Sequence, residues 1–291
     1  MEDEIAIWQD RIHEVLPDLE IFKLNHRSEG LVNDVLIVND AWVVRFTTTA
    51  WGEELMRQEH RLIGLIQPHL TMTVPSSRLV NNNVIIYPYI QGITFSRQIW
   101  AKRPESDQRV LADQLGLFLR ELHGIPIQNP DWDIPHTLAP VSRETWLDIY
   151  DNIETRIKPL LLPHQMDWME ALFEEAMGTP DFFEFDPVVV HGDLVPYHIV
   201  YHPTENQIAA IIDYGSAGIG DPATDLASLI YNYGERLVSK LAETYPGYDA
   251  IIERARFYAH ALDLQWVLLG IESGENYWFT AHLGGARDIF D

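Results

Sequence analysis

The pattern of hydrophobic residues changes from strand-like to helix-like near residues 90–95, and this change limits the folds open to the chain. Before it, short runs rich in β-branched and aromatic residues are typical of strands and lie within 21–47 and 74–90. Residues 53–67 return to helical spacing and end at Pro68. The first part therefore predicts a small, mostly antiparallel sheet with one helix between its third and fourth strands.

Two local patterns add detail to this sheet-forming part. Residues 3–16 place apolar side chains at helical spacing ahead of the first strand. The Asn39-Asp40 pair separates two strand-like runs and favours a tight hairpin turn between them.

Helical spacing dominates the rest of the chain. The predicted helices are 108–123, which Gly124 and Pro126 end, and 144–160, 164–177, 223–245 and 250–273. Three short apolar runs between them read as strands, at 188–191, 198–201 and 208–214. We therefore expect an α+β protein with two lobes, a sheet lobe at 1–91 and a larger, mainly helical lobe at 92–291. A cleft between two lobes is a favoured place for a ligand.

The charge and residue composition exclude several classes of function. With 20 Lys and Arg against 44 Asp and Glu, the net charge is −24, which disfavours nucleic acid and anionic membranes as partners. An acidic surface attracts cationic molecules, although solubility alone also accounts for it. The absence of cysteine excludes disulfides, thiolate metal sites and a cysteine nucleophile. The chain shows neither a secretory signal nor a long apolar segment, so we expect a soluble, cytoplasmic protein.

Two strand-like runs each end on a carboxylate. The run VVVHGDLVPYHIVY turns at Asp193 and resumes at His198, and the run IIDYG ends at Asp213. Carboxylates at the ends of rigid strands can converge on one place, and phosphoryl transfer needs one to accept a hydroxyl proton and others to hold Mg²⁺. A plainer interpretation is that each aspartate only caps a turn. His191 is expected to be structural, with its ring bonded to backbone near Asp213.

The segments HGDLVPYHI and IIDYGSAGIGDPATDLA resemble the catalytic loop and metal-binding segment of the aminoglycoside phosphotransferase family. The resemblance implies a bilobal, protein-kinase-like fold and is nearest to the aminoglycoside 2″- and macrolide 2′-phosphotransferase branches. It implies that Asp193 is the catalytic base and Asp213 the chief Mg²⁺ ligand. His198 stands where the family usually has a metal-side asparagine, and Asp221 resembles a helix cap in the family's structural brace.

The sheet lobe resembles the nucleotide-binding half of the same family. Arg45, in AWVVRF, occupies the place of the phosphate-binding lysine, and Glu59 resembles its helix partner. IIYPYIQG is similar to the hinge that contacts the base. The residues that the resemblance assigns to ATP or GTP are Ser28, Gly30, Arg45, Glu59, Tyr87, Tyr89, Ile90 and Ile212.

The residues that bind the acceptor are less constrained by the sequence. Clustered carboxylates would suit an aminoglycoside, which is the first expectation, and the candidates are Glu235, Asp263, Glu272 and Glu275. Tyr231 and Trp266 would suit a bulkier, less polar acceptor such as a macrolide, or they would simply pack in the core. The sequence is also compatible with a metabolite kinase of the same fold and with a nucleotide-binding relative without catalysis. We expect a monomer or a weak homodimer.

Overall fold

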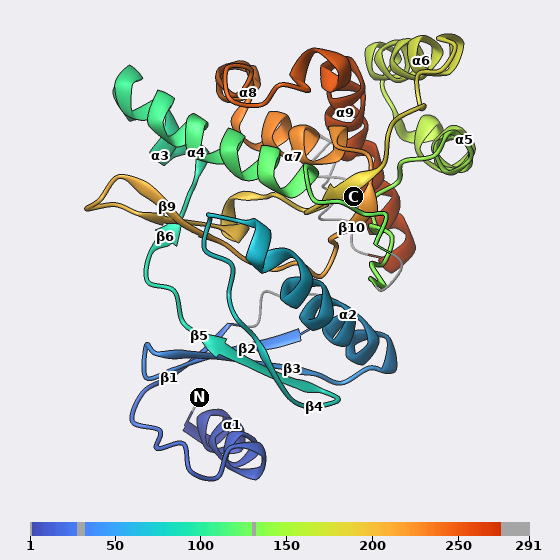
Figure 1. Ribbon diagram of the computed structural model, residues 1–291. Helices are drawn as coiled ribbons and strands as arrows, with labels where there is room; N and C mark the ends of the chain where they lie inside the picture. Colours follow the sequence, from blue (N-terminus) through green and yellow to red (C-terminus); the bar gives the residue numbers. More distant parts are fainter. Residues whose placement is uncertain (1, 28–32, 130–131, 275–291) are drawn as a thin grey trace.

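The computed structural model describes residues 2–27, 33–129 and 132–274. Its N-terminal part is a five-stranded antiparallel sheet in the order β1-β2-β3-β5-β4 (Figure 1). The elements are α1 (Glu2–Val15), β1 (Leu24–Arg27), β2 (Asn33–Val38), β3 (Trp42–Thr47), α2 (Ala50–Ile66), β4 (Arg78–Asn81) and β5 (Val84–Pro88). The sheet and the single helix between its third and fourth strands are as predicted.

The turn between β2 and β3 confirms the hairpin prediction. Asn39 and Asp40 have φ values of 56° and 51°, so both central residues lie in the left-handed region. They are the central residues of a tight turn closed by the hydrogen bond from the Ala41 amide to the Val38 carbonyl oxygen at 3.0 Å, and three residues connect the paired Val38 and Trp42.

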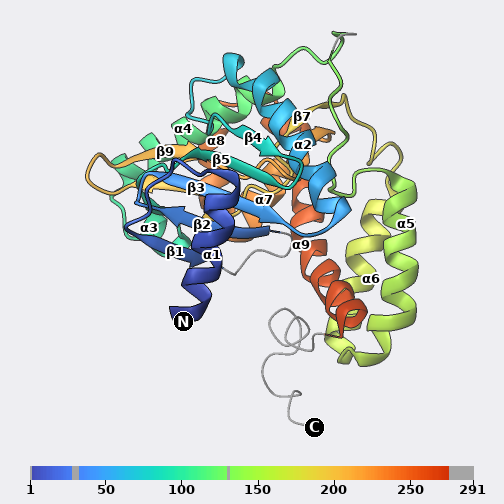
Figure 2. The same cartoon turned by 90° about the horizontal axis from the view of Figure 1, so that it is seen from below.

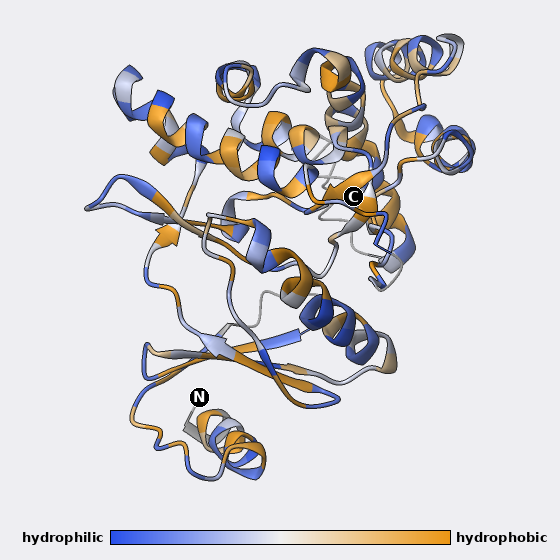
Figure 3. Cartoon of the chain, in the orientation of Figure 1, coloured by the Kyte–Doolittle hydropathy of each residue, from blue (hydrophilic) through white to orange (hydrophobic). Residues whose placement is uncertain are grey.

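Helices cover both faces of this sheet. One face packs on α1, where Trp8 and Ile12 join Val44 and Phe46 in a buried apolar cluster. Side chains alternate along a strand, so Arg45, between those two residues, lies on the opposite face, toward α2. Figure 2 shows α1 lying across the sheet. Figure 3 shows hydrophobic stretches on the strands of this sheet.

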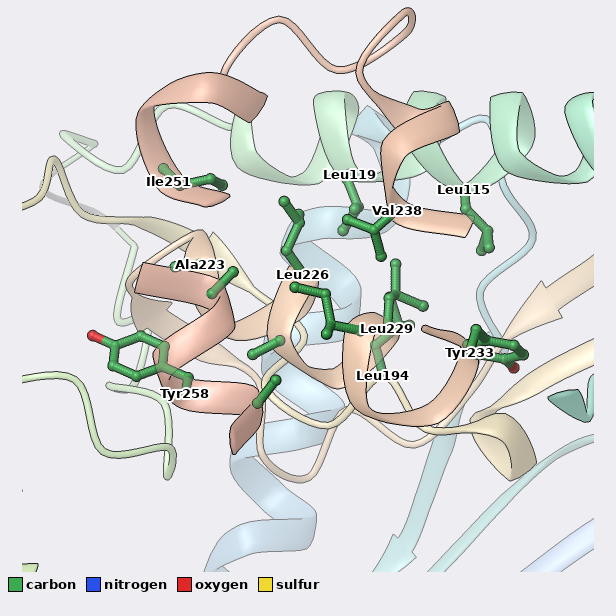
Figure 4. Close-up of a cluster of buried hydrophobic side chains, with 14 of the residues drawn as sticks. Leu115, Leu119, Leu194, Ala223, Leu226, Leu229, Tyr233, Val238, Ile251 and Tyr258 are labelled. Carbon is green, nitrogen blue, oxygen red and sulfur yellow. The ribbon is translucent and has the colours of Figure 1, made fainter. Parts of the chain in front are cut away.

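The C-terminal part is built mainly of helices around α7. Its helices are α3 (Arg97–Ala101), α4 (Glu105–His123), α5 (Arg143–Asn152), α6 (Pro163–Gly178), α7 (Ala223–Tyr233), α8 (Glu235–Leu241) and α9 (Tyr248–Ser273). The α7 helix is buried over most of its length, as its largely apolar sequence predicts; it packs on α8 and α9, and α4 adds side chains to the same buried cluster. Figure 4 shows Leu115, Leu226, Val238 and Ile251 meeting there from these four helices.

The predicted helix over 223–245 is wrong in one respect, because the structure divides it into α7 and α8. The break falls at Gly234, whose φ of 83° is outside the helical region and is tolerated by a residue without a side chain. The break turns α8 toward α4, on which it packs.

Short strands carry the segments that contain the two aspartates. They are β6 (Ile93–Thr94), β7 (Val188–Val190), β8 (Ile199–His202), β9 (Gln207–Ile211) and β10 (Gly218–Gly220). β7 pairs with β10, whereas β8 pairs with β9 and with β6, which follows the link between the two parts. Asp193 and Asp213 therefore follow strands of two different small sheets. No helix within the described ranges is long and apolar enough to cross a membrane.

Candidate active site

The loop that carries Asp193 begins where β7 ends and turns at Gly192. Gly192 has a φ of 78°, and a Cβ there would lie 2.6 Å from the carbonyl oxygen of Ser216. A side chain would thus meet both an unfavourable backbone conformation and a backbone atom that cannot swing away. The glycine lets the strand stop abruptly, so Asp193 lies at a sharp, fixed turn.

His191 ties this loop to the segment before Asp213. Its Nε2 lies 3.1 Å from the carbonyl oxygen of Ile212, and the Asp193 amide donates to Nδ1 at 3.3 Å. The ring is fully buried, which lowers the pKa of His191 to about 4. The ring is therefore neutral, with its proton on Nε2. The sequence-based expectation of a structural histidine bonded to backbone near Asp213 is confirmed.

A buried carboxylate on α7 fixes the same loop from the other side. Asp225 accepts hydrogen bonds from the amides of His191 at 2.9 Å and Gly192 at 2.8 Å. Its Oδ2 also lies 3.1 Å from Nε2 of His123. Burial by itself raises the pKa of Asp225, but the hydrogen bond from His123, its charge and the backbone donors lower it. The carboxylate is thus ionised and rigidly held.

The aspartate just before α7 is a structural residue, as the sequence indicated. Asp221 accepts from the Ala223 amide at 2.9 Å and so caps the helix. It also forms an ion pair with Arg254 and accepts from the Tyr258 hydroxyl at 2.9 Å. The loop-bracing role of Asp225 and His123 was not predicted; the signal was a carboxylate at a helix position surrounded by apolar neighbours, in ATDLASLI.

Asp213 follows β9 in a strained backbone conformation. Its φ of 63° is unusual for a residue with a side chain, and the Gly215 amide donates to its Oδ1 at 3.4 Å. Burial alone raises the pKa of Asp213, but the charges of Arg45 and His198 lower it. Asp213 is therefore an anion that is presented to the space between the two parts of the molecule, with 41% of its side chain exposed.

Arg45 on β3 and Glu59 on α2 form a buried ion pair. Nη1 of Arg45 lies 2.9 Å from both carboxylate oxygens of Glu59, and Nη2 lies 3.8 Å from Oδ1 of Asp213. Burial alone lowers the pKa of Arg45. The negative charges of Glu59 and Asp213 outweigh this effect and raise the pKa above its ordinary value, so the guanidinium stays charged. The pair brings a fixed positive charge beside Asp213.

His198 lies between the two aspartates. Its Nδ1 donates to the Asp193 carbonyl oxygen at 2.8 Å, and the same atom is 3.6 Å from Oδ2 of Asp193. Its Nε2 is 3.5 Å from Oδ2 of Asp213. A carbonyl oxygen only accepts, so Nδ1 carries a proton, and Nε2 is the ring nitrogen that faces Asp213. One imidazole therefore connects the residues that the sequence singled out.

Asp193 itself has 39% of its side chain exposed and faces a cavity. Burial, together with the charges of Asp213 and Asp225, raises the pKa of Asp193, while His198 opposes the shift. A carboxylate with a raised pKa holds a proton more strongly, so it is a better proton acceptor than an ordinary surface aspartate.

The side chains around Asp213 suit a magnesium ion shared with nucleotide phosphates better than a metal ion held by protein ligands alone. Within the described ranges no group of three or more His, Cys, Asp or Glu side chains is arranged to hold an ion. Mg²⁺ is typically bound by one or two carboxylates together with phosphate oxygens and water. Asp213 supplies such a carboxylate, and Nε2 of His198 lies beside it.

The cavity beside Asp193 has a volume of about 360 Å³. It is bounded by α5, α7, α9 and the loop over residues 191–198, which carries Asp193 and is called the catalytic loop below. Of the predicted acceptor residues, Tyr231 and Trp266 line it. Asp263 accepts a hydrogen bond from the Tyr231 hydroxyl at 2.6 Å, behind that lining. Sequence analysis missed Trp146, Tyr197, Leu262 and Gln265, which also line the cavity. They belong to three separate segments that only the tertiary structure brings together.

Two other predicted acceptor residues, Glu235 and Glu272, do not line this cavity. Glu235 pairs with Arg256 at 2.8 Å, and Glu272 pairs with Arg156 at 2.9 Å. Glu275 lies outside the described residues.

Most of the residues predicted to bind the nucleotide lie on the side of the site that contains Arg45. Tyr87 adjoins Arg45, Glu59 and Asp213, and burial raises its pKa to about 12. The Tyr89 amide donates to the carbonyl oxygen of Ala41 at 2.8 Å, which continues the pairing of β5 with β3. Ile90 follows Tyr89 in the link between the two parts of the molecule. Ile212 accepts from His191. Ser28 and Gly30 lie outside the described residues.

A model of the phosphotransferase enzyme family matches residues 23–259, which is most of the chain. This protein belongs to the phosphotransferase enzyme family. The match covers the bracing aspartates and both strand-ending aspartates, and the fold confirms the kinase-like prediction.

A curated relative is similar to part of the chain. Viomycin phosphotransferase of Streptomyces vinaceus is 24% identical over 169 residues, which is 57% of this chain and 58% of that protein. The chain thus spans little more than half of that relative.

Solved structures support the fold over a greater length. The GDP complex of aminoglycoside 2′-phosphotransferase-IIIa has a TM-score of 0.85 at 24% identity and covers 95% of each chain. Macrolide 2′-phosphotransferase from Brachybacterium faecium has a TM-score of 0.75 at 20% identity, over 98% of this chain and 99% of that one.

Proposed function

We propose that this protein transfers the γ-phosphoryl group of ATP or GTP to a hydroxyl of a small, antibiotic-like acceptor. The observation that carries the proposal is the convergence of Asp193 and Asp213 on His198, with the Arg45 charge beside them. Family membership supports the reaction class.

Asp193 is the general base in this proposal. It lines the cavity, and the His191 and Asp225 contacts hold its loop in place. The acceptor oxygen forms a bond to the γ-phosphorus, the bond to the β–γ bridging oxygen breaks, and the hydroxyl proton passes to the Asp193 carboxylate. Correct orientation of the hydroxyl is the main contribution, because phosphoryl transfer depends largely on positioning and charge.

The nucleotide occupies the side of Arg45 and Asp213. Arg45, oriented by Glu59, contacts phosphate oxygens, and Tyr87, Tyr89, Ile90 and Ile212 bound the base. Asp213 holds Mg²⁺ and His198 assists it; when bound, the ion neutralises charge on the phosphates. Ser28 and Gly30 are proposed to contact phosphate as well.

Two acceptor classes have support. The names of the relatives favour an aminoglycoside or a similar cationic antibiotic. The aromatic residues that line the cavity, among them Tyr231 and Trp266, favour a macrolide-like acceptor or a metabolite with an apolar face. A cytoplasmic location and a monomer or weak homodimer, with no nucleic acid or membrane partner, complete the proposal.

The test is a mass-spectrometric screen of aminoglycosides, macrolides and hydroxylated metabolites with ATP or GTP and Mg²⁺. We expect at least one compound to gain a phosphoryl group. Asp193→Asn should lower the rate of that transfer by about 10²- to 10⁴-fold and leave nucleotide affinity unchanged.

A non-catalytic nucleotide-binding relative is the competing possibility, because Arg45 and His198 depart from the usual residues. Nucleotide binding by calorimetry without transfer to any compound would favour it. An unchanged transfer rate in Asp193→Asn would remove that residue from its role.

A further inference from the structure

The acceptor cavity is nearly free of charge, although the protein as a whole carries a net charge of −24. Among the described residues that line it, Asp193 is the sole carboxylate, and none is Lys, Arg or His. Tyr197 and Tyr231 contribute phenol groups to the lining, and a phenol is neutral near pH 7.

Two of the carboxylates that the sequence offered for a polycation, Glu235 and Glu272, are paired with arginines outside the cavity lining. Both carboxylate oxygens of Glu235 bind Arg256, at 2.8 and 3.1 Å. Glu272 faces Arg156 at 2.9 Å. Each arginine already satisfies the negative charge of its partner, so neither pair offers an unneutralised carboxylate to an ammonium group.

The walls of the cavity are instead apolar and aromatic. Trp146 from α5 and Leu262 and Trp266 from α9 lie on one side, and Val195 and Tyr197 of the catalytic loop lie near Asp193. On the α7 side, Ser228 and Asn232 supply neutral polar groups. Aromatic side chains offer large contact areas to the apolar face of a ring, whereas neutral hydroxyl and amide groups can bind hydroxyls without selecting for charge.

We propose that the acceptor is a hydroxylated molecule with an apolar face and at most one positive charge, held mainly by apolar and aromatic contacts. This inference rests on the proposed function and narrows its acceptor. Its binding should depend little on salt, because salt screens charge pairs and leaves apolar contact almost intact.

The test compares three acceptors of different charge: kanamycin with several amino groups, erythromycin with one, and the uncharged 4-nitrophenyl β-glucoside. Acceptor KM and kcat are measured for each at low and high KCl. We expect the highest kcat/KM for an acceptor with one or no charge, with a KM that changes by less than about threefold between the two salt concentrations.

Two variants on α9 separate the apolar from the charged mode of recognition. Leu262→Asn should raise the acceptor KM by about tenfold or more, since burying a leucine side chain contributes about 1.5–3 kcal/mol, and leave the nucleotide KM unchanged. Leu269→Asn, at a site 39% exposed on the same helix, is the matched control and should have no effect. Gln265→Glu adds one carboxylate to the cavity lining and should lower the KM of kanamycin.

Preference for kanamycin with a KM that rises steeply with salt, or an unchanged KM in Leu262→Asn, would overturn the inference while the kinase function stands. If wild-type protein phosphorylates none of the screened compounds, the proposed function fails first and the inference falls with it.

Discussion

Nε2 of His198 lies 3.5 Å from Oδ2 of Asp213, and the opposite ring nitrogen donates to the backbone of Asp193. The imidazole is therefore oriented by the loop that carries Asp193 and directs Nε2 at the proposed metal ligand. A single side chain couples the position of the proposed general base to the side of the site that is proposed to hold the nucleotide.

We expect His198→Ala to raise the Mg²⁺ concentration needed for half-maximal activity by about 10- to 100-fold, because supporting contacts of this kind orient a metal ligand. His198→Asn restores an oxygen ligand and should stay closer to wild type. Both are measured as Mg²⁺ titrations of phosphoryl transfer at fixed nucleotide. Equal titration curves for wild type and His198→Ala would show that His198 has no metal-side role.

Loss of the Arg45 charge should lower both the stability of the protein and its affinity for the nucleotide, and a second substitution should restore only the stability. Arg45→Met leaves the buried Glu59 without its positively charged partner, and we expect it to lower the free energy of unfolding by about 3–5 kcal/mol. The double variant Arg45→Met with Glu59→Leu should recover much of that stability without recovering nucleotide affinity. Urea unfolding and nucleotide calorimetry measure the two effects.

The control for this ion pair is an exposed one. Arg236 lies 2.7 Å from Glu105 with 68% of its side chain exposed, so Arg236→Met should change stability by less than about 1 kcal/mol. A double Arg45 and Glu59 variant with normal nucleotide affinity would contradict the phosphate-binding assignment.

Asp225→Asn should lower kcat more than it changes the nucleotide KM. The asparagine has one acceptor oxygen where the loop uses two, so either the His191 or the Gly192 amide loses its partner. A displaced loop moves Asp193, and a misplacement of about 1 Å can reduce the rate about 100-fold. Steady-state kinetics provide the measurement, with Asp249→Asn on an exposed turn of α9 as control. A proportionate loss in both parameters would indicate general destabilisation instead.

Stability should fall as the pH drops from 6.5 to 4 because His191 is buried and neutral. The unfolded state binds a proton below its ordinary pKa of 6.5, whereas the folded state resists protonation until about 4. The stability contribution is complete above pH 6.5, and its loss at pH 4 amounts to about 3 kcal/mol. His191→Gln should flatten the profile of unfolding free energy in this window. Parallel profiles for the two proteins would contradict the assignment.

Much of the architecture was predictable because it depends on local spacing. Alternating and helical patterns predicted the sheet, the helix that carries Glu59 and the turn at Asn39 and Asp40. The break at Gly234 was missed, since a glycine within an apolar helical run is compatible with either outcome until α8 packs on α4.

The sequence by itself singled out the residues that are proposed to carry the chemistry, because Asp193 and Asp213 come after apolar strands and His198 directly precedes one. Only the tertiary structure decided how they meet. Their strands belong to separate sheets, and Asp225 and His123, distant in the chain, hold the loop between them. It also decided that Glu235 and Glu272 face arginines and that Leu262 and Gln265 face the acceptor cavity. Such pairings depend on how helices pack against one another, which spacing along one segment does not specify.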